Sequence, residues 1–329
     1  MRLPLLLTCA LLGCAKAEAA ETLPKIERLD PRLDALVPPD ARFEKIADGF
    51  GWTEGPAWNA ATGELFFSDV ETNHMHAWSA KNDTRIVLED SGYVRAAPFT
   101  GREPGSNGIA FDSQGRAAFC QHGERRISRL ERDGARTVLV DRYPSGPGGK
   151  RLNSPNDLVY SRAGDLYFTD PPFGLPGTFD DPAKELDFSG VYRLSAPGEL
   201  TLLTRELEGP NGIALSPDEK TLYVANNSPT RPLWMAYELR ADGTLGPGRV
   251  LFDAKPFTAT RRGFPDGLKV APSGHLFAAG PEGIYVLTSE GEHLGTLFFG
   301  ALTSNCAFGP GGALFVTVDS AIYRLAPGG

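Results

Sequence analysis

The sequence predicts an all-β protein, a six-bladed β-propeller with four-stranded blades, on three observations. A five-residue motif that begins with a polar, oxygen-bearing side chain and ends with a large apolar one occurs six times, between 38 and 55 residues apart. Each copy is followed by a turn and further short apolar runs, and no stretch shows sustained helical periodicity. The chain also has 38 Gly and 27 Pro, which suit short strands joined by tight turns. Self-similarity at this period is typical of propellers.

The composition narrows the class of function. The chain has 329 residues, of which 41% are hydrophobic and 22% charged, and this is ordinary for a soluble globular protein. Its formal net charge of −8 disfavours a nucleic-acid partner and suits a cation better than an anionic polymer. We therefore expect a small-molecule ligand or substrate.

The first 20 residues are expected to be a secretory signal peptide. They combine a basic start, an apolar stretch and small residues at cleavage spacing, and they are too short for a membrane span. The alternative is a bacterial lipoprotein signal that ends before Cys14, with Cys14 as the site of a lipid anchor. Both predict an exported protein, either periplasmic or secreted. No other stretch approaches the length of a transmembrane segment.

Two cysteines remain in the body of the chain, Cys120 and Cys306. They fall in the second and sixth repeats, which are not neighbours in sequence order. We predict two buried free thiols rather than a disulfide.

The repeats divide the mature chain into a lead-in and one closed domain. Residues 21–42 are expected to be irregular or briefly helical, and the propeller is expected to span residues 43–327. Four strands can be traced in the second repeat (109–111, 117–120, 126–130 and 137–140) and four in the third (158–160, 166–168, 191–194 and 200–203). An insertion at 171–190 interrupts the third repeat. Residues 43–46 are expected to pair with 322–325 and close the sixth blade, because closure removes free sheet edges.

The first strand of each blade lines the central channel, so its first residue lies at the same end of the channel in every blade. The six residues at this position are Glu54, Asn107, Asn156, Asn211, Asp266 and Ser304. They supply carboxylate, amide and hydroxyl oxygens, which favour Ca²⁺ or Mg²⁺ over zinc. The alternative is a purely structural ring, because Asn and Asp also begin strands and turns.

The second strands return to the same end, so their last residues are expected to face the same pocket. These residues are Asp69, His122, Asp170, Asn226 and Asn227. Among the five histidines only His122 is well placed near the ring, and it is a candidate for contact with a substrate.

Six motifs with their order and spacing resemble the senescence marker protein/gluconolactonase/luciferin-regenerating-enzyme family, and bacterial gluconolactonases most of all. The motifs are Thr53-Glu54-Gly55-Pro56, Asn153-Ser154-Pro155-Asn156-Asp157-Leu158, Tyr167-Phe168-Thr169-Asp170-Pro171, Gly209-Pro210-Asn211-Gly212-Ile213-Ala214, Leu222-Tyr223-Val224-Ala225 and Pro265-Asp266-Gly267-Leu268. They cover nearly the whole mature chain.

The resemblance implies one divalent metal at the channel mouth, usually Ca²⁺, with Mg²⁺, Mn²⁺ or Zn²⁺ as alternatives. The family's metal ligands match Glu54, Asn156, Asn211 and Asp266, and its general base matches Asp266. Asn107 is left as a substrate-binding residue. Family members with a sugar-lactone pocket carry an Arg two residues before the third-blade Asn, where this chain has Ser154.

The resemblance favours hydrolysis of a sugar lactone, with the metal as Lewis acid and Asp266 as general base. Two alternatives stay open. The same metal would suit a phosphotriester or aryl-ester hydrolase, and the fold would also suit a non-enzymatic periplasmic binding propeller with structural calcium. A serine nucleophile is not supported, because the chain has no Gly-x-Ser-x-Gly motif.

Overall fold

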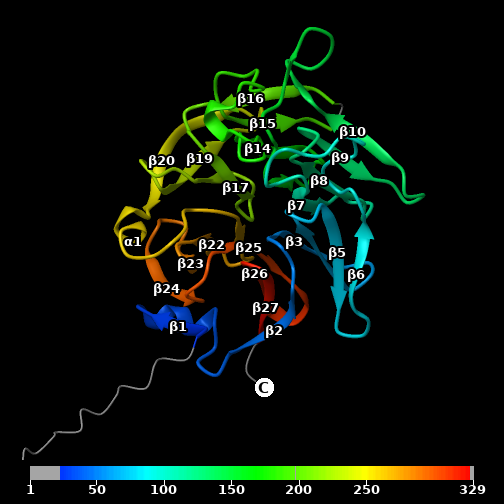
Figure 1. Cartoon of the computed structure of the whole chain (residues 1–329). Helices are drawn as coiled ribbons and strands as arrows, with labels where there is room; N and C mark the ends of the chain where they lie inside the picture. Colours follow the sequence, from blue (N-terminus) through cyan, green and yellow to red (C-terminus); the bar gives the residue numbers. More distant parts are fainter. Residues whose placement is uncertain (1–22, 197, 327–329) are drawn as a thin grey trace, which may run out of the picture.

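The computed structural model describes residues 23–196 and 198–326, and it shows six antiparallel sheets arranged as blades around a central channel (Figure 1). This confirms the predicted six-bladed β-propeller. The predicted signal peptide and the alternative lipid anchor at Cys14 lie outside the described residues. Export therefore stays a prediction, which N-terminal sequencing of the mature protein would check. No helix in the described ranges is long and apolar enough to span a membrane.

The first three blades each consist of four consecutive strands. Blade one contains β3 (Thr53–Asn59), β4 (Glu64–Asp69), β5 (His74–Ser79) and β6 (Asp83–Leu88). Blade two contains β7 (Ser106–Phe111), β8 (Ala117–Gln121), β9 (Arg126–Leu130) and β10 (Arg136–Val140). A hairpin of β11 (Arg142–Tyr143) and β12 (Lys150–Arg151) leads to blade three, which contains β13 (Leu158–Tyr160), β14 (Leu166–Asp170), β15 (Gly190–Leu194) and β16 (Leu200–Thr204).

The remaining blades include two strands from the start of the chain. Blade four contains β17 (Pro210–Leu215), β18 (Thr221–Asn226), β19 (Leu233–Leu239) and β20 (Leu245–Asp253). Blade five contains β21 (Leu268–Val270), β22 (Leu276–Gly280), β23 (Gly283–Leu287), β24 (His293–Phe298) and β1 (Lys25–Arg28). Blade six contains β25 (Thr303–Phe308), β26 (Leu314–Val318), β27 (Ala321–Ala326) and β2 (Arg42–Asp48). The helical segments are α1 (Lys255–Thr258) and the 3₁₀ turns η1 (Pro31–Ala35), η2 (Thr178–Asp180) and η3 (Pro310–Gly312).

The predicted closure of the propeller is confirmed. Strand β2 pairs antiparallel with β27, with Phe43 opposite Leu325, so the start and the end of the chain share the sixth blade. The lead-in is more ordered than its sequence indicates. Besides the short turn η1, it supplies β1, which pairs with β24 as a fifth strand of blade five. Its sequence Lys-Ile-Glu-Arg has one apolar residue, too weak a pattern to be read as a strand without the neighbouring edge.

Burial is greatest in the middle of a blade and least at its outer edge. The second strands β14 and β22 are buried along their whole length, whereas most residues of the outer strand β6 are exposed or half-buried. Each blade packs against a neighbour on both faces, so its inner strands are covered from both sides and read as short continuous apolar runs. This explains why the repeats show short apolar runs rather than strict alternation.

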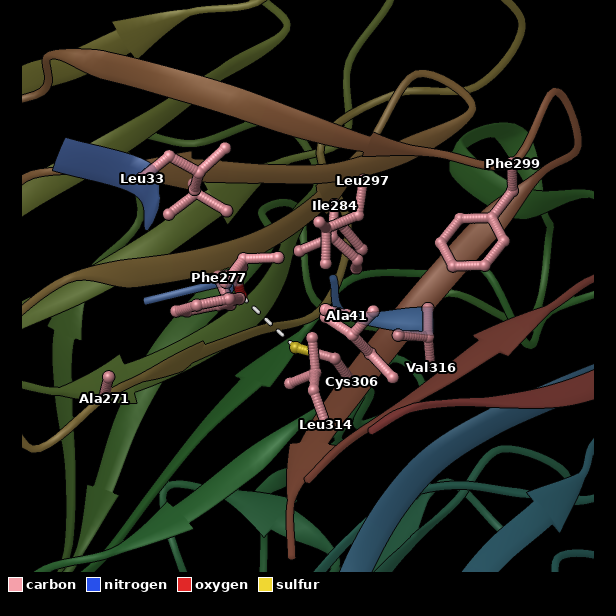
Figure 2. Packing of buried hydrophobic residues seen from close by; sticks show 14 of the residues in the cluster. Leu33, Ala41, Ala271, Phe277, Ile284, Leu297, Phe299, Cys306, Leu314 and Val316 are labelled. Atoms are coloured by element: carbon pink, nitrogen blue, oxygen red, sulfur yellow. Dashed lines mark hydrogen bonds between the residues drawn. The ribbon is translucent and has the colours of Figure 1, made fainter. Parts of the chain in front are cut away.

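One apolar cluster lies between each pair of neighbouring blades in the described part of the chain. Figure 2 shows the cluster between blades five and six, where the buried Cys306 thiol donates a hydrogen bond to the Phe277 carbonyl at 3.3 Å. Leu33 and Val37 from the lead-in complete this cluster. Burying each such Leu or Phe side chain contributes about 1.5–3 kcal/mol.

The inner strands approach one another very closely around the channel. A Cβ added at Gly212 would lie 2.4 Å from the carbonyl oxygen of Asp266 in the next blade, and one at Gly55 would lie 2.1 Å from the carbonyl oxygen of Asn107. Such contacts are shorter than carbon and oxygen allow, so only glycine fits. The glycine that follows the first residue of the motif therefore sets the diameter of the channel.

We expect Gly212→Ala to destabilise the protein by about 3 kcal/mol, because an extra methyl group in a packed core forces the backbone to move. Urea unfolding would measure the loss. The control is Gly115→Ala: Gly115 has φ +75° but open space around its Cβ position, so it should lose only about 1 kcal/mol. A smaller loss for Gly212→Ala than for Gly115→Ala would contradict the close packing.

Candidate active site

The six predicted ring positions lie in one ring, each in contact with the next blade. The backbone N–H of Gly108, next to Asn107, donates to the Asn156 carbonyl at 2.8 Å. The N–H of Gly267, next to Asp266, likewise donates to the Ser304 carbonyl at 2.8 Å. Two further bonds link neighbouring blades: Thr169 Oγ1 donates to the Asn211 carbonyl at 2.7 Å, and Ser304 Oγ donates to the Thr53 carbonyl at 2.7 Å.

The two carboxylates of the ring are oriented by their own backbone. Glu54 Oε2 accepts the N–H of Gly55 at 2.9 Å, and Asp266 Oδ1 accepts the N–H of Gly267 at 3.0 Å. Burial raises the pKa of both carboxyl groups, and the charge of Asp157 raises both further. Glu54 also raises the pKa of Asp266 by direct repulsion. The ionised forms of the two carboxyl groups are therefore unfavourable unless a positive charge, such as that of a cation, lies beside them.

Two amide oxygens at the ring have no partner. Asn107 Oδ1 and Asn156 Oδ1 are both buried and make no hydrogen bond within the described residues. Leaving a buried acceptor unpaired costs about 1–3 kcal/mol. Two carboxylates beside two unpaired amide oxygens fit a hard divalent cation. No three His, Cys, Asp or Glu side chains of the described chain form a metal cluster, so amide oxygens would have to complete the ligand set.

Serine occupies two of the predicted positions, and both hydroxyl groups are used by the fold. Ser304 is fully buried, and its Oγ also bonds Thr317 Oγ1 at 2.7 Å. Ser154 is fully buried too; its Oγ donates to the Pro171 carbonyl at 2.6 Å and accepts the Gly174 N–H at 2.9 Å. Ser154 therefore anchors the insertion of blade three beside the ring.

The expectation that the second strands end in pocket residues is wrong for three of them. Asp69 Oδ2 accepts the N–H of Gly51 at 3.0 Å, Asp170 Oδ2 accepts that of Asn153 at 2.8 Å, and Asn226 Oδ1 accepts that of Gly209 at 3.0 Å. Each bond holds the loop two or three residues before a ring residue. These buried side chains hold the loops that lead to the ring residues, and they do not line the pocket.

His122 lies at the rim between blades two and three. Its backbone N–H donates to the Gly105 carbonyl at 3.2 Å, two residues before Asn107. A Cβ at Gly174 would lie 2.6 Å from His122 Cβ and 2.9 Å from Ser154 Cβ, so the insertion packs on both. The imidazole is fully buried, and Nδ1 is bonded to Glu103 Oε2 at 2.9 Å.

Sequence reasoning missed Glu103. It lies in the 89–105 connection, which the repeat pattern does not cover. Its charge raises the pKa of both Glu54 and Asp266, which places its carboxylate near the mouth of the ring. Only the fold brings it there.

A second group inside the channel was also missed. Lys269 Nζ bonds Asn305 Oδ1 at 3.2 Å and lies 3.7 Å from Asp157 Oδ2. Asn305 Nδ2 in turn reaches Glu54 Oε2 at 3.5 Å. Lys269 thus places one positive charge beside the ring, against the four carboxylates of Glu54, Glu103, Asp157 and Asp266.

The cysteines match their prediction. Cys120 and Cys306 are free and buried. Burial raises the pKa of Cys120 well above its usual value and that of Cys306 to about 12, so neither thiol ionises as a nucleophile would.

Comparison with known proteins gives three findings. The sequence profile of the SMP-30/Gluconolactonase/LRE-like region matches residues 52–320. A gluconolactonase of Zymomonas mobilis is 38% identical, with 97% of this chain and 91% of that protein covered. The structure of XC5397 from Xanthomonas campestris, described as a gluconolactonase, superposes with a TM-score of 0.79 at 33% identity and covers 95% of this chain and 99% of that one.

A more distant structure shows the same fold. Regucalcin from Agrobacterium tumefaciens, described as a calcium-binding protein, has a TM-score of 0.66 at 19% identity, with 87% of this chain and 94% of that one covered. At this identity the similarity concerns the fold alone.

We expect Asp170→Asn to remove a pH dependence of stability. Burial raises the pKa of Asp170 from 3.8 to about 7. The Asp170 carboxyl therefore ionises at lower pH in the unfolded chain, and wild-type stability relative to the variant should fall as the pH rises from about 4 to about 7, by about 4 kcal/mol at most. Asn226 shows that an amide serves at the equivalent position of blade four. Urea unfolding at a series of pH values would measure it.

The matched control is Asp187→Asn, an exposed aspartate of the same insertion. It should leave the pH dependence unchanged. A variant Asp170→Asn whose stability parallels the wild type from pH 4 to pH 7 would show that the buried carboxyl is ionised in the folded protein.

Proposed function

Because this chain belongs to the SMP-30/gluconolactonase/LRE-like family, we propose that it is a lactonase that hydrolyses the ester bond of a sugar lactone. The proposal is carried by one observation: the ring positions include two buried carboxylates whose charges interact and two buried amide oxygens without a partner among the described residues. It is supported by two relatives described as gluconolactonases that match over nearly the whole chain.

We propose one divalent cation as cofactor, held by Glu54, Asn156, Asn211 and Asp266, with Ca²⁺ favoured by the all-oxygen donor set. When bound, it would act as a Lewis acid that polarises the lactone carbonyl. The unpaired Asn107 Oδ1 makes this side chain a further donor, toward the cation or toward a substrate hydroxyl.

Asp266 is proposed as the general base that takes a proton from the attacking water. A cation lowers the pKa of a carboxylate bound to it, which weakens the base. In this chain burial, Glu54, Asp157 and Glu103 raise the pKa of Asp266 and oppose that effect. We propose that these negative surroundings offset part of the cation's effect on the basicity of Asp266.

The insertion of blade three, beside the ring, supplies part of the proposed contacts with the substrate. Ser154 and Gly174 anchor residues 171–189 beside the ring, and Phe173 reaches Gly209 at the entrance to blade four. This insertion and the 89–105 connection meet at His122, which contacts Gly174 of the first and Glu103 of the second. They are therefore proposed to bind the sugar hydroxyl groups, in place of the Arg that related sugar-lactone pockets carry at the position of Ser154.

We expect chelation to abolish hydrolysis of glucono-1,5-lactone and added Ca²⁺ to restore it. Initial rates above the spontaneous background, with Mg²⁺, Mn²⁺ and Zn²⁺ added back in parallel, would identify the cation. The melting temperature should fall on chelation, because a ligand that binds only the folded state stabilises it by mass action. Full turnover in metal-free protein would overturn the cofactor, and metal-dependent turnover of phosphotriesters without lactones would favour the alternative hydrolase.

We expect Glu54→Gln and Asp266→Asn to lower kcat/KM for the lactone at least about 100-fold, because each weakens the hold on the cation that would stabilise the developing oxyanion, and Asp266→Asn also removes the general base. Steady-state kinetics with metal content measured on the same samples would test this. Among the amides, Asn156→Ala should lose more metal affinity than Asn107→Ala. Wild-type rates in both carboxylate variants would rule out the ring as the active site.

A further inference from the structure

The structure leaves one imidazole nitrogen without a partner at the rim of the ring. His122 is fully buried, and its Nε2 makes no hydrogen bond within the described residues. Its Nδ1 is occupied by Glu103 Oε2 at 2.9 Å. A buried, unpaired polar atom costs about 1–3 kcal/mol, and a ligand that supplies the missing partner recovers this cost.

His76 provides a contrast within the same chain. Its Nε2 is also buried and unpaired, but its ring is stacked on Phe67 at 5.3 Å and packed edge-on against Phe50 at 5.1 Å. His76 is thus a core aromatic residue. His122 is instead held by a carboxylate, at the rim of a ring of oxygens.

The pair Glu103–His122 has the arrangement of a proton-transfer dyad. A carboxylate that accepts Nδ1–H fixes the orientation of the imidazole and stabilises it when Nε2 is protonated. Nε2 is then the only imidazole nitrogen of His122 that is free to exchange a proton with a ligand. Residues 105 and 174, which contact His122, come from the 89–105 connection and from the insertion of blade three.

Lactone hydrolysis also needs a proton on the leaving oxygen of the lactone. The carboxylates of Glu54 and Asp266 do not provide it. Water adds to the carbonyl carbon, and Asp266 takes one of its protons. The bond between that carbon and the oxygen of the lactone ring then breaks. This oxygen would leave as an alkoxide unless it is protonated. Base catalysis at one oxygen and acid catalysis at the other require two groups.

We propose that His122 is a catalytic residue of this reaction, the general acid whose Nε2–H protonates the ring oxygen as it leaves, and that Glu103 is its positioning residue. The inference rests on the proposed lactonase function. The hydroxy acid formed releases its proton to water, and the proton on Asp266 returns to Nε2 through solvent, so the enzyme is restored.

The test uses two lactones that differ in their leaving group. Glucono-1,5-lactone releases an aliphatic alcohol, whereas dihydrocoumarin releases a phenol, which is a much stronger acid and leaves without protonation. We expect His122→Asn to lower kcat about 100-fold or more on glucono-1,5-lactone and less than about 5-fold on dihydrocoumarin, with unchanged metal content. Glu103→Gln should show the same selectivity with a smaller loss, because the amide still accepts Nδ1–H but carries no charge.

His76→Asn is the matched control, since it removes the other buried, unpaired imidazole. Any effect it has through stability should leave the ratio of the two kcat values unchanged. A second readout is the ¹⁵N shift of His122, whose Nε2 resonance should move when the unreactive lactam analogue of the sugar lactone binds.

Equal losses on both substrates, or a raised KM with kcat unchanged, would show that His122 only binds the substrate or supports the fold, and would overturn the inference. Wild-type protein that turns over neither lactone would overturn the proposed function, and the inference with it. Selective loss on the alkyl lactone supports both.

Discussion

The close approach of six inner strands around the channel is the constraint on which the rest of the structure depends. Wherever the motif has Gly in its second position, the backbone of one blade contacts the carbonyl oxygen of the next without room for a side chain. Asp157 and Asn305 replace this glycine in blades three and six, and their side chains lie inside the channel against Gly108 and Gly267. The contacts between neighbouring inner strands therefore hold the first residues of the motifs in one ring.

This arrangement brings together acidic groups whose negative charge the protein neutralises only in part. The charges of Glu54, Asp266 and Asp157 repel one another in a buried site, and Lys269 supplies a positive charge nearby. Such a site lowers the stability of the folded chain unless a cation binds. Local destabilisation of this kind is common at functional sites. The apolar clusters between the blades offset that loss, because they are many and continuous around the propeller.

The ring and the segments that cover it have different origins. The ring comes from the repeat, so its geometry follows from the architecture, and it supplies oxygens suited to a cation. Glu103 and Gly174 come from connections that break the repeat, and they bring His122 and Ser154 under a common cover. In propellers, as in other scaffolds, rigid strands position the reactive groups while loops determine what they act upon.

The sequence by itself determined the architecture and the ring, because both repeat. Six copies of one motif predict six blades, equivalent positions predict a circle, and the pairing of β2 with β27 follows from the need to close it. Only the tertiary structure decided the rest. Strand β1, the loop-holding roles of Asp69 and Asp170, and the pair Glu103–His122 depend on contacts between segments far apart in sequence. A local sequence pattern does not encode such contacts. Whether a short segment forms a strand, holds a loop or supplies an acidic group depends on what the fold places beside it.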